Sequence, residues 1–142
     1  TEIYTLSLHD ALPISALLSA AAALVFAGAH AFIYRYLFLE HSVIHLPALA
    51  SLFAVGVIRN NAILAYGHAG FSWTLHLSWN LVFFGGRYIC DGGRECTQAD
   101  LFNTIMGNWP FVAASLAVAI ATTLLLHLVA ARNGKILSAS QS

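Results

Sequence analysis

Three polar side chains within apolar stretches are the residues of this sequence best suited to chemistry. His76 and Asn80 are four residues apart, so on a helix both side chains lie on one face, one turn apart. His30 lies in a separate apolar stretch. An imidazole is a tunable proton donor or acceptor, and an amide offers two N–H donors. Together these groups could hold a water molecule or stabilise a developing oxyanion in a dry cavity.

Hydrogen bonding between helices is the alternative role for the same residues. For any one of them alone, this structural role explains the residue at least as well as a functional one. Three such side chains on two apolar stretches favour a functional site. We therefore treat His30, His76 and Asn80 as candidate catalytic residues.

The composition predicts a membrane environment for these residues. Hydrophobic residues make up 59% of the 142 residues and charged residues 8%, with a mean hydropathy of +0.76. Soluble domains are about 45–50% apolar and about 25% charged. The net charge of zero also lacks the electrostatic footprint of a nucleic-acid-binding protein. We predict an integral membrane protein in contact with the lipid bilayer, and exclude a soluble enzyme, a disordered chain and a disulfide-rich secreted module.

Stretches without formal charge predict an all-α, polytopic bundle of about four transmembrane helices. A span needs about 20 mostly apolar residues, and in lipid a helix satisfies its own backbone hydrogen bonds. The predicted spans lie near residues 16–38, 43–58, 70–86 and 109–131. The second is short because Arg59 closes its charge-free run. Residues 87–108 are predicted to form a polar loop and residues 132–142 a polar tail.

The first residues differ in character from the rest of the chain. Thr1–Ile14 matches, residue by residue, the in-frame translation of a widely used short-read sequencing adapter. The stretch also lacks the basic and apolar regions of a signal peptide. We therefore expect residues 1–15 to be an artefact and this chain to be a C-terminal fragment of a longer protein. His9 and Asp10, which look like a catalytic pair, are set aside for that reason.

Two cysteines bear on the orientation of the bundle. Cys90 and Cys96 lie close together in the predicted polar loop, where either a disulfide or two free thiols is expected. Positive residues divide equally between the two sides of the predicted bundle, so the positive-inside rule gives no orientation. A cysteine pair suits an oxidising compartment. This favours an external loop and a cytoplasmic C-terminus.

The remaining histidines suit weaker roles. His41 and His45 have the spacing of a metal-binding pair on a helix, with Glu40 alongside. They lie at an expected membrane interface and lack a further ligand, so we favour exposed interfacial histidines. No role is assigned to His68 or His127.

Two motifs in the predicted spans resemble those of a known family. Residues Phe26–His30 (FAGAH) are similar to the FxxxH motif, and His76–Asn80 (HLSWN) to the HxxxN motif, of the CPBP family. This family, also called Abi, comprises CAAX proteases and bacteriocin-processing proteins. Gly67, nine residues before the second histidine, also resembles the family pattern. The resemblance covers about residues 16–86.

The resemblance implies an intramembrane endopeptidase. A glutamate would take a proton from water, and the water would attack the peptide carbonyl. His76 and Asn80 would stabilise the oxyanion, while His30 would orient the water or, together with His76, bind a divalent metal such as zinc. The substrate would be a peptide or protein at the membrane, for example a prenylated or bacteriocin-like peptide. The location implied is a prokaryotic cell membrane.

The glutamate motif of that family, EExxxR, is missing from this sequence. In the family it lies on the helix before the FxxxH motif. Glu40 is no substitute, because no second glutamate adjoins it and no arginine follows four residues later. The fragment itself is therefore expected to be inactive, and the full-length protein to be the protease.

Other classes of function stay open. A non-catalytic membrane protein, such as an immunity or partner-binding relative of the same family, would explain the missing glutamates. A membrane di-iron hydroxylase is suggested only by His41 and His45, and that chemistry needs several histidine boxes. A transporter has no inverted repeat or broken helix in its favour.

Overall fold

The computed structural model describes residues 8–37, 43–90 and 98–139, and within them the side chains of residues 16–36, 43–81 and 102–132. The elements are α1 (Leu8–Phe32), the π-helical segment η1 (Ile33–Leu37), α2 (Leu46–Tyr66), α3 (Gly70–Cys90), α4 (Gln98–Met106) and α5 (Trp109–Ala139). Every regular element in these ranges is a helix, which confirms the predicted all-α class.

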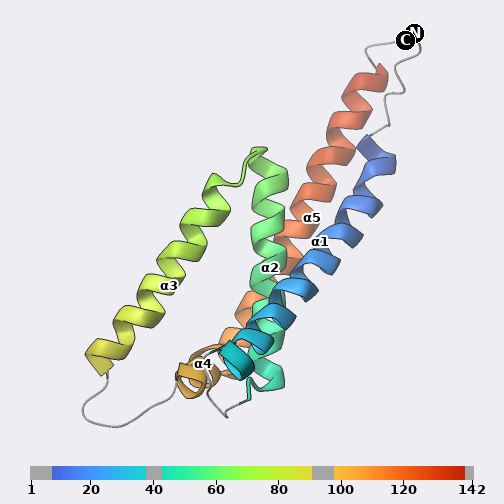
Figure 1. The fold of residues 1–142 in the computed structure, drawn as a ribbon. Helices are drawn as coiled ribbons and strands as arrows, with labels where there is room; N and C mark the ends of the chain where they lie inside the picture. Colours follow the sequence, from blue (N-terminus) through green and yellow to red (C-terminus); the bar gives the residue numbers. More distant parts are fainter. Residues whose placement is uncertain (1–7, 38–42, 91–97, 140–142) are drawn as a thin grey trace.

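Helix α2 is the centre of the bundle. It packs against α1 and against α5, and these three helices run side by side in Figure 1. The short helix α4 lies at the end of the bundle where α2 begins, and it contacts both α2 and α5. Helix α3 follows α2 through a tight turn, contacts it, and then diverges from the other helices.

Three helical segments are long and apolar enough to cross a membrane: Ala16–Tyr36, Leu46–Tyr66 and Trp109–Arg132. Their large apolar side chains point outward, whereas small side chains fill the contacts between helices. Leu24 and Leu128 are 67% and 69% exposed, while Ala23 and Ala48 are fully buried. An apolar surface around a core of small residues suits lipid rather than water. The protein is an integral membrane protein, and three such helices are roughly consistent with the predicted four spans.

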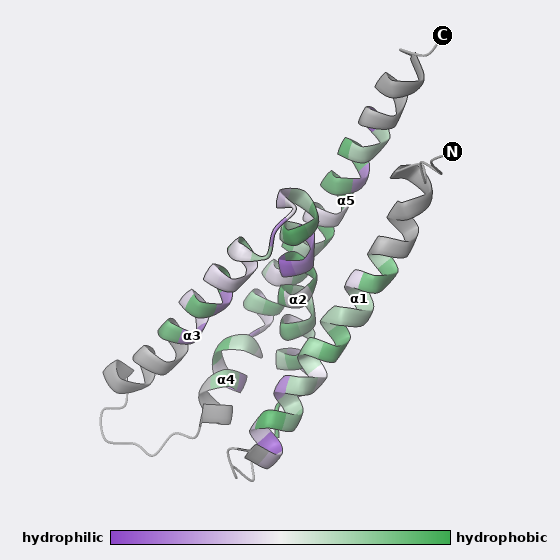
Figure 2. Cartoon of the chain, turned by 45° about the horizontal axis from the view of Figure 1, so that its top comes forward, coloured by the Kyte–Doolittle hydropathy of each residue, from purple (hydrophilic) through white to green (hydrophobic). Residues whose placement is uncertain are grey.

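Helix α3 covers the third predicted span and is more polar than its neighbours. Figure 2 shows white and purple residues along it, where α1 is mainly green. Thr74 and Ser78 bond through their hydroxyls to carbonyls one turn earlier in the same helix. Ser72, His76 and Asn80 follow one another at intervals of four residues and therefore share one face of the helix.

The second span is longer than predicted. It is expected at residues 43–58, but α2 extends to Tyr66. The prediction treats the charge of Arg59 as marking the membrane surface, whereas the helix continues past this residue. In the structure this side chain turns into the bundle, where its Nε donates a hydrogen bond to Ser72 Oγ at 2.9 Å. The helix ends instead at Gly67, whose left-handed conformation (φ 71°) closes the last turn.

In the segment predicted as a polar loop, residues 87–108, most of the residues that the structure describes are helical. Helix α3 continues to Cys90, and α4 buries Phe102 and Met106, which are 3% and 0% exposed. These two side chains are one turn apart, so one face of α4 joins the core formed with α2. The side chain of Cys90 and all of Cys96 lie outside the described residues, so both alternatives, a disulfide and two free thiols, stay open.

Both ends of the bundle extend past the predicted limits. Helix α1 begins at Leu8, inside the segment predicted to be an artefact, and α5 continues to Ala139 through most of the predicted polar tail. Each residue added to a helix gains one backbone hydrogen bond, so a helix readily propagates into a neighbouring segment. The helical form of the first residues therefore says nothing about their origin.

Asparagine side chains join the helices. Asn61 Nδ2 donates to the hydroxyls of Thr122 and Thr123 on α5, each at 2.9 Å. Asn60 Nδ2 donates to the carbonyl oxygen of Ser19 on α1, also at 2.9 Å. Hydrogen bonds of this kind contribute about 0.6–2 kcal/mol each between helices in a membrane. They hold α1 and α5 against α2 at adjacent positions of its last third.

The amide of Asn103 attaches α4 to the start of α2. Its Nδ2 donates to the carbonyl oxygen of Val43 at 2.9 Å, and its Oδ1 accepts from the N–H of His45 at 2.8 Å. In addition, Ser51 Oγ on α2 donates to the carbonyl oxygen of Met106 at 2.7 Å. That carbonyl lies at the end of α4, where a helix leaves its acceptors unpaired. These three bonds position α4 at the end of the bundle.

Replacing Asn103 by alanine is expected to destabilise the protein by about 1–2 kcal/mol, because two backbone groups lose their partner. Unfolding in detergent, followed by circular dichroism, measures the change. The matched control is Asn108→Ala, since this exposed side chain forms no hydrogen bond with any residue that the structure describes. Equal stabilities of the two variants would show that the Asn103 amide contributes nothing to the fold.

Candidate functional site

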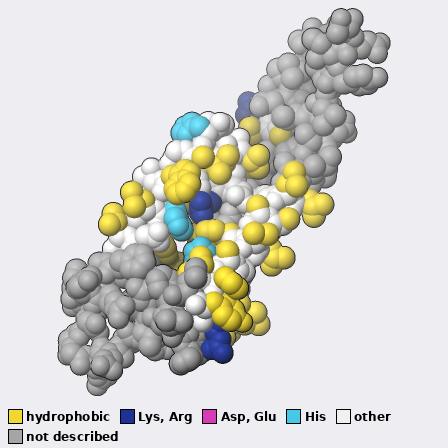
Figure 3. Space-filling model, viewed as in Figure 1, with side chains coloured by type: hydrophobic (Ala, Val, Ile, Leu, Met, Phe, Trp, Pro, Cys, Tyr) yellow, Lys and Arg dark blue, Asp and Glu magenta, His cyan; other side chains and the backbone are white. Residues whose placement is uncertain are grey.

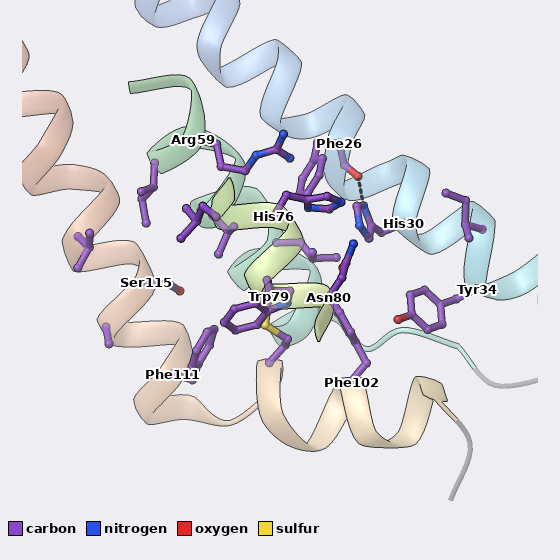
Figure 4. A pocket seen from close by; sticks show the side chains of 18 residues that line it. Phe26, His30, Tyr34, Arg59, His76, Trp79, Asn80, Phe102, Phe111 and Ser115 are labelled. Carbon is purple, nitrogen blue, oxygen red and sulfur yellow. Dashed lines mark hydrogen bonds between the residues drawn. The ribbon is translucent and has the colours of Figure 1, made fainter. Parts of the chain in front are cut away.

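A cavity of about 440 Å³ lies between the helices, and α1 to α5 together with η1 contribute to its lining. Its walls are largely apolar and include aromatic rings from α1, η1, α3, α4 and α5, which are labelled in Figure 4. The polar side chains that face it are His30, Tyr34, Arg59, His76, Asn80 and Ser115. Figure 3 shows histidine and arginine side chains together in a hollow of this face, with hydrophobic side chains around them.

The structure brings together the three residues that the sequence singles out. His30 comes from α1, whereas His76 and Asn80 come from α3 (Figure 4). The ring centroids of His30 and His76 are 6.1 Å apart, and the rings are nearly perpendicular at 83°. The ring of Phe26 packs against both, with centroids 4.3 Å from His30 and 5.9 Å from His76. One small ligand in the cavity would therefore reach all three polar groups.

A backbone contact orients the ring of His30. Its Nδ1 lies 2.8 Å from the carbonyl oxygen of Phe26. Because a carbonyl only accepts, Nδ1 carries the hydrogen of the neutral ring, and Nε2 presents a lone pair. The π-helical segment η1 begins three residues later, and such turns occur frequently at functional sites. His30 is thus arranged to accept a hydrogen bond, or a proton, at Nε2.

The side chains of His76 and Asn80 are half-buried. Neither forms a hydrogen bond with any of the residues whose side chains the structure describes. Both project from the same face of α3, which their four-residue spacing requires (Figure 4). An imidazole and an amide beside an apolar wall retain their donors for a bound molecule.

Arg59 is the residue of this site that the sequence analysis misses. Its Cζ lies 4.8 Å from the centroid of the Phe26 ring, a cation–π distance, and its Nε is bound by Ser72. The sequence contains an indication of this role, because Arg59 is a charged residue between two apolar stretches. Such a residue marks either the end of a helix or a functional position inside a helix. Only the position of α3 distinguishes the two, because α3 supplies the hydroxyl that binds the guanidinium.

The other histidines whose side chains the structure describes, His45, His68 and His127, do not line this cavity. The side chain of His45 is exposed, while His41 falls outside the described residues, so the proposed pair cannot be placed. His68 Nδ1 accepts from the N–H of Gly70 at 3.2 Å, within the turn between α2 and α3. His127 lines a separate, smaller cavity between α1, α2 and α5.

Metal binding at the cavity would require more donors than the structure shows. Zinc hydrolases hold the ion with three protein ligands and keep one position open. In the part of the chain that the structure describes, no group of three or more His, Cys, Asp or Glu residues is close enough to hold a metal ion. His30 and His76 alone do not complete a zinc site.

Comparison with models of protein families, with curated proteins and with solved structures finds no match to this chain. The fold and the cavity define a class: an α-helical integral membrane protein whose apolar cavity carries two imidazoles, an amide and a guanidinium.

Proposed function

We propose that the full-length protein is an intramembrane endopeptidase of the CAAX-protease type. The observation that supports this most directly is the meeting of His30, His76 and Asn80 at one apolar cavity. The two motifs lie on different helices, so nothing local to either motif requires them to meet. A site for hydrolysis within a membrane needs donors, acceptors and a low-dielectric surrounding, and this cavity combines them.

The proposed roles follow from the hydrogen-bonding capacity of each side chain. Nε2 of His30 accepts a hydrogen bond from the attacking water and so positions its oxygen toward the peptide carbonyl carbon. When the new C–O bond forms, the carbonyl oxygen gains negative charge. N–H groups of His76 and Asn80 then stabilise this oxyanion, more strongly than they would in bulk water.

A carboxylate is the remaining requirement of the mechanism. It takes the proton that the attacking water loses and returns it to the leaving amine when the C–N bond breaks. No aspartate or glutamate occurs among the residues whose side chains the structure describes. In the proposal this group comes from an EExxxR segment upstream of α1 in the full-length protein. The metal suggested by the resemblance stays a prediction.

The walls of the cavity favour an apolar peptide segment as the substrate. Aromatic side chains such as Phe26, Trp79 and Phe111 present a broad apolar surface beside the polar groups. Membrane-associated peptides, prenylated or bacteriocin-like, are the substrates that we propose, and a prokaryotic cell membrane is the proposed location.

The orientation in the membrane is affected by the new position of Arg59. A cytoplasmic C-terminus was expected from the cysteine pair because the positive residues of the two sides were equal in number. Since Arg59 lies inside a span, the C-terminal side keeps only Arg132 and Lys135. The opposite side carries Arg35, Arg87 and Arg94. Arg35 also lies in a candidate span, and without it and Arg59 the positive residues again divide equally, so the cytoplasmic C-terminus that the cysteine pair favours stays part of the proposal.

A non-catalytic, partner-binding membrane protein is the second candidate. It is favoured by one observation: the described side chains around the cavity include no carboxylate to act as a base. In that case the histidines and the asparagine would bind a peptide segment of a partner without cleaving it. The two candidates differ in whether the full-length protein hydrolyses a peptide bond.

Sequencing the source DNA across Ser15 and expressing both forms of the protein tests the proposal. The upstream frame is expected to encode an apolar helix with EExxxR. A protein carrying that segment in place of residues 1–15 is expected to cleave hydrophobic reporter peptides in proteoliposomes, whereas the 142-residue chain does not. The matched control replaces both upstream glutamates by glutamine. An upstream frame without paired glutamates, or an extended protein that cleaves no peptide, would favour the partner-binding candidate.

A further inference from the structure

Arg59 is a positive charge inside a membrane-spanning helix. It lies in the candidate span Leu46–Tyr66, two turns before the helix ends, and its side chain faces the cavity. An arginine within a span is expensive in free energy and generally has a partner or a function. The mechanism proposed above does not use it.

The contacts of Arg59 with the described residues fix the direction of its side chain and use only its Nε as a hydrogen-bond donor. Nε is used by Ser72, which is 1% exposed, and the face of the guanidinium packs on Phe26. The two terminal nitrogens carry four further N–H groups. None of them bonds to any residue that the structure describes with its side chain. The guanidinium is thus held in place with its fork unoccupied.

A carboxylate is the group that this fork matches. Arginine presents parallel N–H bonds that pair with both oxygens of a carboxylate, and the pair is stronger where water is excluded. No acidic side chain among those described is available to neutralise the charge. The cavity therefore combines a long apolar wall with one fixed positive group, which is complementary to an apolar molecule bearing one negative group.

We infer that Arg59 recognises a carboxylate of the bound peptide, and this inference rests on the proposed peptidase function. The same Phe26 ring separates Arg59 from His30, so the carboxylate would lie close to the bond that is cleaved (Figure 4). Either the C-terminal carboxylate or an Asp or Glu side chain would provide this chemistry. Arg59 is then a residue that determines specificity.

Peptide binding to the 142-residue chain in zwitterionic lipid nanodiscs tests this inference. The probes are three forms of one fluorescent hydrophobic pentapeptide: a free C-terminal acid, its C-terminal amide, and the amide with one internal glutamate. At least one acidic form is expected to bind about tenfold or more tightly than the neutral amide, as for a hydrogen-bonded charge pair. Which acidic form binds more tightly identifies the source of the carboxylate.

Substitutions assign the preference to Arg59. Arg59→Gln is expected to abolish the preference for acid by weakening only the acidic forms, and Arg59→Lys to retain part of it, since lysine keeps the charge but not the fork. The matched control is Arg132→Gln, which removes an exposed arginine of α5 and is expected to leave all three affinities unchanged. If the Arg59→Gln variant does not insert into the membrane, the Arg59→Lys variant is compared with the unmodified chain instead. Equal binding of the three peptides by the unmodified chain, or equal weakening of all three by the Arg59 variants, overturns the inference.

The binding assay separates this inference from the proposed function. Binding requires no catalytic glutamate. If the chain prefers acidic peptides but the full-length protein hydrolyses none, the peptidase proposal is contradicted and the inference about Arg59 is not. If the full-length protein hydrolyses neutral and acidic peptides at the same kcat/KM, the inference about Arg59 is contradicted and the peptidase proposal is not. The preference must also be present in the full-length protein. If the full-length protein shows no preference for acidic peptides, an upstream glutamate pairs with Arg59. That result contradicts recognition of the substrate carboxylate by Arg59.

Discussion

Replacement of His76 or Asn80 by alanine in the full-length protein is expected to lower kcat by about 10²–10³-fold without preventing membrane insertion. Each substitution removes an N–H donor that acts on the oxyanion, and neither side chain has a described hydrogen bond that supports the fold. Since the donors act mainly on the transition state, KM should change much less than kcat. Asn80→Asp is expected to be equally damaging, because a carboxylate repels an oxyanion.

Cleavage of a reporter peptide in proteoliposomes measures these effects. His127→Ala is the matched control, because that histidine lies in the same bundle but lines the separate cavity between α1, α2 and α5. It is expected to retain full activity. Unchanged cleavage by the His76 or Asn80 variant would rule out the proposed oxyanion site. Loss of activity in all three variants would point to a general effect on the fold.

Gly56→Ala is expected to destabilise the bundle by about 1–3 kcal/mol, because it overpacks the contact between α1 and α2. A Cβ at this position would lie 2.9 Å from Ala23 Cβ and 3.0 Å from Ala23 Cα. The second of these atoms is backbone, so the helices themselves would have to move apart. The same Cβ would lie 3.4 Å from the ring of Phe26, which contacts His30, so activity should fall as well.

Gly28→Ala is the matched control for this substitution. Gly28 is exposed on α1, and a Cβ there would have no neighbour within 4 Å. Alanine is a better helix former than glycine, so this variant is expected to gain up to about 1 kcal/mol. The same chemical change should therefore have opposite signs at the two positions. Detergent unfolding of both variants measures it, and a shift of the same sign in both would contradict the close contact described here.

The sequence alone was sufficient for the properties that depend on composition and on neighbouring residues. An apolar content of 59% predicts a membrane protein, and long uncharged stretches predict helices because lipid offers the backbone no other partners. The shared face of His76 and Asn80 follows from a spacing of four residues, which is a local property of any helix. His30 is grouped with that pair because all three are polar residues within apolar stretches and because of the motif resemblance, whereas nothing in the spacing of the two stretches implies a contact.

Tertiary structure decided whatever depends on contacts between distant residues. The role of Arg59 is set by Ser72 on another helix, and a charge that looked like the end of a span lies at the cavity instead. The predicted loop contains α4 because Asn103 and the apolar face of that helix find partners about 60 residues earlier in the chain. Hydrophobic periodicity predicts which residues are shielded from water. The residues that they contact depend on how whole helices pack against one another.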